Sequence, residues 1–351
     1  MTMTLPEALP LEPATLGRAA PRARTIPVGP LRVVALGGGT GLPVVLRGLA
    51  PQVRPRNGHR GLDLTAVVAM SDDGGSSGRL RRTRGLLPPG DVRNCLVALA
   101  NSRGALTEVL QFRFGGSGSL AGHALGNLLL AALAEMHGDF LQAVRSASRL
   151  LEARGTVLPS TVDPVQLVAE LEDGRRVLGE RHLARAGTRV RRVLLHPLRP
   201  APAEGVLEAI AAADLVTLGP GSLYSSVLPN LLVDGVAEAL RTTPARRVLV
   251  ANLMTEPGET GGMAAADHLR AVLDHAGPVV DVVLLNSAPL GMARVNRYAR
   301  AGAEPVRTDV ERMRAMGAVP VEADLLRKGP RLRHDPRKLG KALLSVLAGQ
   351  G

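Results

Sequence analysis

The stretch that decides the fold is LRVVALGGGTG, residues 31–41. Its first six residues are almost all apolar and predict a short buried strand, which the glycines end in a tight turn. Residues 42–49 predict a helix with Pro43 in the first turn, where its missing N–H costs nothing. A Gly-rich turn before a helix brings backbone amides close to an anion. We therefore expect a phosphate or diphosphate here, bound by Gly37, Gly38, Gly39, Thr40 and Gly41.

The spacing of these glycines matches neither standard nucleotide-binding fingerprint. A dinucleotide-binding turn needs Gly or Ala at its sixth position, which is Leu42 counted from Gly37 and Val44 counted from Gly39. A P-loop needs a Gly-Lys-Ser/Thr sequence, and no lysine is near. Taken alone, the turn is equally consistent with a tight strand–helix connection that binds nothing.

Two further Gly-rich turns follow predicted strands. Residues 63–70 lead into SDDGGSSGR at 71–79, and residues 214–218 lead into GPGSLYSS at 219–226. The alternation of strands and helices predicts an α/β fold with a Rossmann-like, doubly wound, mostly parallel sheet. Ligands of such sheets bind beyond the carboxyl ends of the strands, so these turns should lie side by side. They add seven candidate ligand-binding residues: Asp72, Asp73, Gly74, Ser76, Gly219, Gly221 and Ser222.

The paired carboxylates Asp72 and Asp73 have two interpretations. They have the chemistry to bind a ribose hydroxyl or to hold a hydrated Mg²⁺ against a phosphate. Alternatively, aspartate after a strand often caps the following turn through backbone amides. If the chain binds a metal, these two residues are the expected ligands.

Two helical segments carry further polar candidates. In PPGDVRN, residues 88–94, Asp91 is the expected N-cap of a helix through residue 100, and Asn94 is a candidate contact. Residues 120–128 predict a helix after another Gly-rich turn, with His123 and Asn127 one turn apart on a shared face. A lone helical histidine is commonly structural, but this position favours ligand contact. We exclude a zinc helix because it lacks a second histidine or carboxylate.

The domain organisation follows from changes in pattern along the chain. Residues 1–29 are rich in Pro, Ala and Arg without a continuous apolar segment, which predicts a disordered extension rather than a signal peptide. Residues 30–351 form one nucleotide-binding domain, within which 155–196 is a possible small β insertion. Its clearest feature is a hairpin around residues 172–174, Glu-Asp-Gly.

Composition narrows the function classes. The single cysteine, Cys95, excludes a disulfide framework and a Cys-based zinc site and favours a cytoplasmic protein. No apolar segment reaches the roughly 18 residues that span a membrane. The net charge of +12 invites a nucleic-acid role, but arginines are scattered through every segment and aromatics amount to 1%. We expect a solvated, arginine-biased surface and no nucleic-acid partner.

Five ordered motifs together resemble the YvcK/CofD-like family. They are the turn at 37–42, the run at 71–79, residues 89–94, GHALGNL at 122–128 and GPGSLY at 219–224. The uninterrupted DDGGSSGR and GPGSLYSSVLPN runs are similar to the YvcK branch, the gluconeogenesis factors. The resemblance extends from about residue 31 to the end of the chain.

The resemblance implies a UDP-sugar-binding regulator, with UDP-N-acetylglucosamine as the notable ligand. It implies a role linking carbon metabolism to cell-wall precursor synthesis and cell shape, apparently through glucosamine-6-phosphate synthase, and a homo-oligomeric state. Two family residues held to bind the UDP-sugar match Tyr298, in Arg-Tyr-Ala, and Arg333, in Leu-Arg-His. Arginine can bridge a diphosphate bidentately and tyrosine can stack on uracil. The C-terminal loop at 329–341 lacks Ser and Thr, which excludes phosphorylation within it.

Two enzyme interpretations remain open beside the regulator. The CofD branch of the family consists of Mg²⁺-dependent transferases that move a phospholactyl group onto a deazaflavin, and it uses the same glycine turn and paired aspartates. A redox protein that binds NAD is the weakest alternative because the dinucleotide fingerprint is broken. For a regulator we expect no required cofactor and no catalytic residues, with Mg²⁺ as an optional addition.

Overall fold

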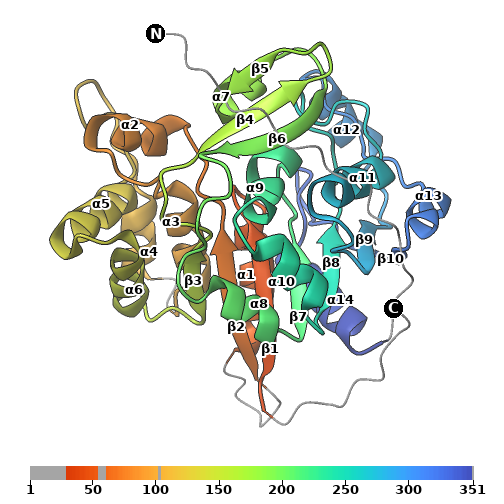
Figure 1. Cartoon of the computed structure of the whole chain (residues 1–351), viewed down its shortest axis with the longest axis horizontal. Helices are drawn as coiled ribbons and strands as arrows, with labels where there is room; N and C mark the ends of the chain where they lie inside the picture. The colour runs from red at the N-terminus through yellow and green to blue at the C-terminus, as the bar shows by residue number, and fades with distance from the viewer. Residues whose placement is uncertain (1–28, 54–60, 102–103, 350–351) are drawn as a thin grey trace.

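The structure, a computed structural model, describes residues 29–53, 61–101 and 104–349. Nearly all of the predicted N-terminal extension at 1–29 therefore lies outside the described residues. Within the described part, Figure 1 shows a central parallel sheet surrounded by helices, with a smaller sheet set over one end.

The main sheet contains seven strands in the order β10-β9-β8-β7-β1-β2-β3, and every pair of neighbours is parallel. Its strands are β1 (Leu31–Gly37), β2 (Leu62–Val68), β3 (Thr156–Pro159), β7 (Leu215–Leu218), β8 (Arg246–Val250), β9 (Val282–Asn286) and β10 (Val319–Ala323). The predicted doubly wound parallel sheet is confirmed.

Helices connect these strands and cover the sheet. The first half contains α1 (Leu42–Leu49), α2 (Gly75–Arg84), α3 (Gly90–Leu99), α4 (Ala105–Gln111), α5 (Leu125–His137), α6 (Phe140–Leu150) and α7 (Glu180–Leu183). The second half contains α8 (Val206–Ala212), α9 (Leu228–Leu231), α10 (Val236–Thr242), α11 (Ala265–Ala276), α12 (Met292–Ala299), α13 (Val310–Ala315) and α14 (Pro336–Leu347). Short helical turns precede β2 at Ala50–Gln52 and α9 at Leu223–Val227.

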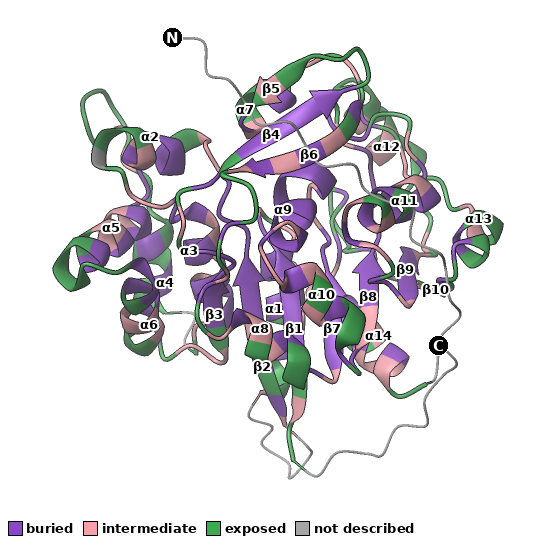
Figure 2. Cartoon of the chain, in the orientation of Figure 1, coloured by how far each residue is buried: buried purple, intermediate pink, exposed green. Residues whose placement is uncertain are grey.

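The core lies on both faces of β1 and its neighbours. Helix α1 packs against β1, β2, α3 and α14, whereas α8 packs against β1 beside α10. The central strands are buried along most of their length, as Figure 2 shows. Strands covered on both faces read as continuous apolar runs, which is why β1 and β2 could be recognised from sequence.

The direction of chain winding reverses next to β1. After β1 the chain adds β2 and β3 on one side, and it then returns to add β7, β8, β9 and β10 on the other. The gap between the ends of β1 and β7 is therefore the topological switch point, where open α/β sheets form their ligand crevice.

A separate antiparallel sheet consists of β4 (Gln166–Leu171), β5 (Arg176–Leu178) and β6 (Val190–His196), in the order β5-β4-β6. The hairpin expected around residues 172–174 is present. The predicted insertion at 155–196 starts too early, because β3 pairs with β2 in the main sheet. In Figure 1 the small sheet lies over the carboxyl ends of the main strands.

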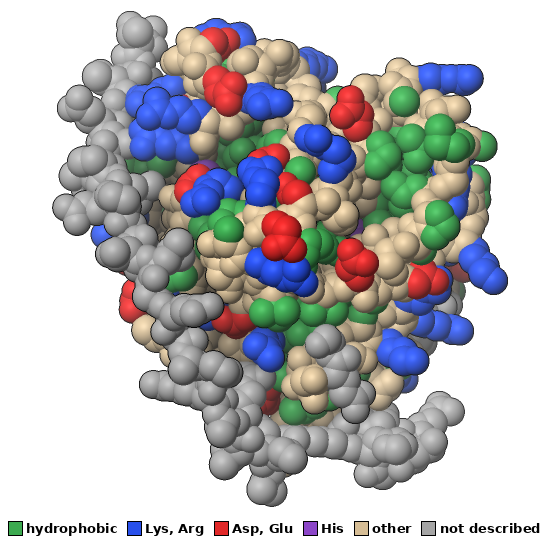
Figure 3. All heavy atoms as spheres, turned by 90° about the vertical axis from the view of Figure 1, so that its right-hand side faces the viewer, with side chains coloured by type: hydrophobic (Ala, Val, Ile, Leu, Met, Phe, Trp, Pro, Cys, Tyr) green, Lys and Arg blue, Asp and Glu red, His purple; other side chains and the backbone are tan. Residues whose placement is uncertain are grey.

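The described residues include no helix that is both long and apolar enough to cross a membrane. On the face beside α11, α12 and α13, basic and acidic side chains alternate (Figure 3). This face shows no continuous basic surface, which agrees with a solvated, mixed-charge interpretation of the high net charge.

Candidate functional site

The glycine turns that follow β1 and β7 lie in direct contact at the switch point. The amide of Gly219 donates a 3.0 Å hydrogen bond to the carbonyl of Leu36. A Cβ added at Gly41 would lie 1.8 Å from the carbonyl oxygen of Pro220. Only glycine permits this approach, so the two turns form one structural unit as the sequence predicted.

In the turn at 37–41 the amide of Gly39 is occupied, whereas the amides of Thr40 and Gly41 are open. The amide of Gly39, whose φ is +58°, donates a 2.6 Å hydrogen bond to the Asp91 carboxylate. The amides of Thr40 and Gly41 form no hydrogen bond with any described residue. Two open amides beside a helix N-terminus are suited to an oxyanion.

The prediction that Asp91 caps a helix is wrong. Helix α3 begins at Gly90 with Pro89 at its N-cap position, so Asp91 lies within the first turn. From there its carboxylate reaches across to the turn after β1. Burial, the largest cause, and the charge of Asp72 raise the pKa of Asp91 to about 6.

Two asparagines form hydrogen bonds with the backbone of the turns at 37–41 and 219–226, which we call the paired turns. Asn252, which follows β8, accepts from the Gly221 amide at 3.1 Å and donates to the Gly221 carbonyl at 2.9 Å. Asn230, on α9, is fully buried and donates to the carbonyls of Gly37 at 3.2 Å and Ser226 at 2.8 Å. Each asparagine thus satisfies backbone groups that a turn leaves unpaired.

The paired aspartates after β2 point in different directions. Asp72 accepts a 2.7 Å hydrogen bond from the amide of Gly74, so it caps the following turn as the alternative interpretation held. Asp73 instead accepts from the amide of Arg181 at 3.3 Å and so fixes the small sheet. The two carboxylates therefore contact different elements. No group of three or more metal-ligating side chains is placed to bind an ion among the described residues.

Ser76 is the centre of a buried polar network. Its hydroxyl lies 3.0 Å from His123 Nδ1 and accepts a 3.0 Å hydrogen bond from Asn127. Asn127 in turn accepts from the buried Arg93 at 2.8 Å, and Arg93 also donates to Asn94 at 2.8 Å. The network thus joins four residues predicted from three separate segments, namely Ser76, Asn94, His123 and Asn127, and we call it the Ser76 network.

The expectation that His123 lies on a helix with Asn127 is wrong. Helix α5 begins only at Leu125, and residues 120–123 form a tight turn in which the His123 amide donates to the Leu120 carbonyl. Gly122 adopts a φ of +73°, which ends any helical continuation. His123 and Asn127 nevertheless converge because both contact the Ser76 hydroxyl.

Carboxylates border the paired turns on the side of the small sheet. The hydroxyl of Ser222 donates to Glu256, and that of Ser225 donates to Glu259 at 3.1 Å. Burial is the main cause that raises the pKa of Glu259 to about 7 and that of Glu180 to about 8. The charges of Asp72, Glu259, Asp91 and Asp73 raise the pKa of Glu180 further, so these groups lie close to it. We call Asp72, Asp91, Glu180, Glu256 and Glu259 the acidic belt.

The two residues taken from the family resemblance lie beyond the ends of β8 and β9. Tyr298, on α12, packs with Leu253 and Leu332, and its hydroxyl accepts a 3.2 Å hydrogen bond from the Leu332 amide. Arg333 is exposed, and the next residue, His334, is buried. This pair is therefore separate from the Ser76 network, with the paired turns between them in the order of the sheet.

Sequence reasoning missed the residues whose partners are distant in the chain. Asp91, Asn230, Asn252 and the two glutamates at 256 and 259 were not among the candidates. The signal for Asn230 was weak but present, because Asn230 ends the GPGSLYSSVLPN run that the resemblance rests on. No local pattern identifies Glu180. Its position depends on the small sheet, because it lies on α7 directly after β5.

Residues 33–326 match the family model described as 2-phospho-L-lactate transferase CofD. A protein of Halalkalibacterium halodurans named gluconeogenesis factor is 44% identical over 89% of this chain and 95% of its own length. The gluconeogenesis factor of Bacillus subtilis is 42% identical, with coverage of 90% and 98%. A crystal structure of a Bacillus halodurans protein is 43% identical with a TM-score of 0.86, covering 90% of this chain and 99% of that one.

Proposed function

This chain belongs to the CofD family, with gluconeogenesis factors among its similar relatives, and we propose that it binds a UDP-sugar as a regulatory ligand. The observation that carries the proposal is the contact between the glycine turns at the switch point of the sheet. The open amides of Thr40 and Gly41 supply donors for one phosphate of the diphosphate.

Tyr298 and Arg333 are the proposed contacts of the uracil and of a phosphate. Tyr298 lies beyond the ends of β8 and β9, next to the turn that contains Asn252. An aromatic ring suits stacking on uracil, and Arg333 is exposed and able to donate to a phosphate. We propose UDP-N-acetylglucosamine as the ligand, with contacts from this pair and from the paired turns.

Carboxylates of the acidic belt should oppose the binding of a diphosphate when they are ionised. A diphosphate placed at the turns lies near Asp91 and Asp72, and their ionised forms repel it. Mg²⁺ relieves such repulsion, since it commonly bridges one or two carboxylates and ligand phosphates. The ligand should therefore bind with and without Mg²⁺, and the ion should strengthen binding above pH 6, where Asp91 is ionised.

The proposed biological role starts from the name gluconeogenesis factor that similar relatives carry, and it extends that name by what the motif resemblance implies. We propose that ligand occupancy links carbon metabolism to cell-wall precursor supply and to cell shape, in the cytoplasm. Glucosamine-6-phosphate synthase is the proposed protein partner, and a homo-oligomer is the proposed state. A regulator requires only that its ligand binds two conformations with different affinity, so the ligand leaves chemically unchanged.

A phosphoryl-linked transferase is the second candidate, in line with the description of the matching family model. The observation that favours it is that Asp72 and Asp91 lie close enough for the charge of one to raise the pKa of the other. Two carboxylates beside an anion-binding turn are able to share a Mg²⁺ that stabilises charge at phosphorus. Turnover, rather than binding, distinguishes this candidate from the regulator.

A ligand screen by thermal shift tests the proposal. UDP-N-acetylglucosamine, UDP-glucose, GDP and NAD are each added with and without Mg²⁺. We expect the UDP-sugars to raise the melting temperature and NAD to leave it unchanged, because a ligand that binds only the folded state stabilises it. Stabilisation by NAD and not by UDP-sugars would overturn the assignment.

A further inference from the structure

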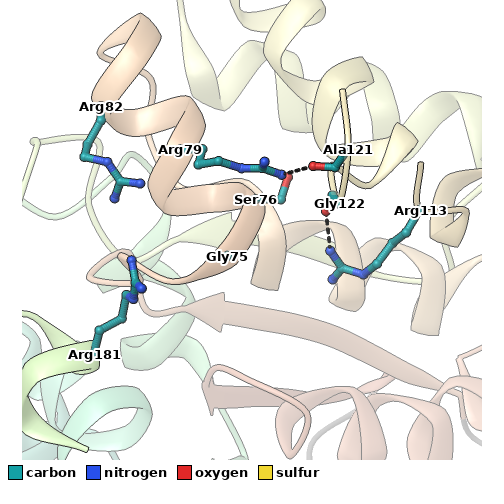
Figure 4. A pocket seen from close by; sticks show the side chains of 8 residues that line it. All are labelled: Gly75, Ser76, Arg79, Arg82, Arg113, Ala121, Gly122 and Arg181. Atoms are coloured by element: carbon teal, nitrogen blue, oxygen red, sulfur yellow. Dashed lines mark hydrogen bonds between the residues drawn. The ribbon is translucent and has the colours of Figure 1, made fainter. Parts of the chain in front are cut away.

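A cavity lies beside the loop and helix α2 that follow β2. Its volume is about 410 Å³, and it is open to solvent between α2, the turn before α5 and the start of α7. Figure 4 shows the residues that line it: Gly75, Ser76, Arg79, Arg82, Arg113, Ala121, Gly122 and Arg181.

Arginine is the only ionisable residue type in this lining. Four arginines from three separate segments face the cavity, and no carboxylate lines it. None of their guanidinium groups forms a salt bridge with a described residue, although eleven salt-bridge contacts occur elsewhere in that part of the chain. We call this the arginine cavity.

Two of the arginines are held in place by backbone carbonyls. Arg79 donates to the Ala121 carbonyl at 2.6 Å, and Arg113 donates to the Gly122 carbonyl at 3.1 Å. Arg82 and Arg181 are exposed, and in Figure 4 their side chains extend from opposite walls into the space between α2 and α7. Guanidinium groups bind phosphate oxygens through pairs of N–H donors, so four of them around one space suit an oxyanion with several negative charges.

The arginines act on neighbouring groups. The charge of Arg79 contributes to lowering the pKa of His123, after burial, and that of Arg113 contributes to lowering the pKa of Arg93, again after burial. No carboxylate lines the cavity, so an anion placed there is attracted by all four guanidinium groups.

We propose that the arginine cavity binds a small metabolite with two phosphoryl groups, at a site distinct from the UDP-sugar site. The volume exceeds what one phosphate fills, and four cations match the charge of two phosphoryl groups near neutral pH. The lining of the cavity contains no residue of the turns at 37–41 and 219–226, so the two proposed sites share no side chain.

The two sites are connected through the Ser76 network. Ser76 lines the arginine cavity, and its hydroxyl is bonded to Asn127, which holds Arg93 on α3. The same helix carries Asp91, whose carboxylate contacts the amide of Gly39. A ligand in the arginine cavity thus acts on an element that also contacts the nucleotide turn.

Calorimetric titration of the full-length chain with inorganic pyrophosphate tests the proposal. We expect saturable binding that weakens at least tenfold in the double variant Arg82→Gln/Arg181→Gln. The matched control is Arg270→Gln, an exposed arginine on α11, which should bind as the unmodified chain does. Circular dichroism checks that the variants are folded, and the single variant Arg181→Gln provides a second reading if the double variant is not.

Further arms separate this proposal from its alternatives and from the UDP-sugar proposal. Saturating UDP-N-acetylglucosamine should not displace pyrophosphate, and citrate at equal ionic strength should bind at least tenfold more weakly than pyrophosphate. Failure of pyrophosphate to bind, equal binding by the double variant, displacement by UDP-N-acetylglucosamine or equal binding of citrate would each overturn the proposal. Pyrophosphate binding by a chain that does not bind UDP-sugars would reject the UDP-sugar proposal and leave this one standing.

Discussion

The carboxylate of Asp91 accepts a 2.6 Å hydrogen bond from the backbone amide of Gly39, across 52 residues of sequence. This contact joins the first turn of α3 to the glycine turn after β1. It places a negative group beside the amides that we assign to a phosphate. If the turn binds a phosphate as proposed, the ionised form of Asp91 weakens the attraction of the turn for it.

Replacement of Asp91 by Asn should make stability less sensitive to acid pH. The pKa of Asp91 in the folded chain, about 6, lies above the ordinary value of 3.8. The folded state therefore binds more protons between about pH 4 and 6, and the stability contributed by Asp91 falls as the pH rises through that window. A shift of this size corresponds to roughly 1–3 kcal/mol.

Urea denaturation at several pH values measures this effect. As the pH rises from 4 to 6, the free energy of unfolding of the unmodified chain should fall relative to that of Asp91→Asn. The variant should also bind UDP-N-acetylglucosamine more tightly at pH 7.5 without Mg²⁺, because the repelling charge is gone. A difference in stability that stays constant with pH would contradict the assigned pKa.

Replacement of Gly41 by Ala should separate the paired turns. Its Cβ would lie 1.8 Å from the carbonyl oxygen of Pro220, a backbone atom that cannot move aside without shifting the second turn. We expect a loss of about 1–3 kcal/mol in the free energy of unfolding, together with loss of UDP-sugar binding. Gly261→Ala is the control, since a Cβ there meets nothing within 4 Å. Equal stability of the two variants would reject the close contact.

Replacement of Asn127 by Ala should destabilise the fold through Arg93. The Arg93 side chain is only 6% exposed and would lose one of its two hydrogen-bond acceptors. Loss of a partner by a buried charged group costs about 1–3 kcal/mol. Asn296→Ala, at an exposed position on α12, should change stability by less than about 0.5 kcal/mol. Thermal denaturation of both variants measures this difference. If Asn127→Ala destabilised the chain as little as Asn296→Ala does, Asn127 would have no role in holding Arg93.

Replacement of Arg333 by Ala should weaken UDP-N-acetylglucosamine binding by about 1.5–3 kcal/mol, the value of a charge-assisted contact. Stability should change little, because the side chain is exposed. Arg331→Ala provides the control within the same loop, at another exposed position. Calorimetry in which both variants lose affinity equally would show that the loop contributes only general positive charge.

The parallel, doubly wound sheet and the contact between the turns could be predicted from sequence because both depend on local patterns. An apolar run that ends in glycines indicates a buried strand and a tight turn, and parallel strands place such turns on one edge. The partners of Asp91 could not be predicted in this way, since its local position fits a helix cap equally well.

The arginine cavity was hidden for a different reason. Its four arginines come from 79–82, 113 and 181, and arginine is scattered through the whole sequence, so no spacing distinguishes them. Only the turn before α5 and the small sheet bring them together. The different contacts of Asp72 and Asp73 were likewise not predicted, because a turn cap and a metal ligand both fit an aspartate after a strand.

The central claim is that this chain binds a UDP-sugar at the paired turns and releases it unchanged. Phosphorus NMR during prolonged incubation of the full chain with UDP-N-acetylglucosamine and Mg²⁺ tests it most directly. We predict that the diphosphate resonances shift on binding and that the ligand is recovered intact. Absence of any shift, or Mg²⁺-dependent breakdown of the ligand that is lost in Asp72→Asn, would contradict the claim.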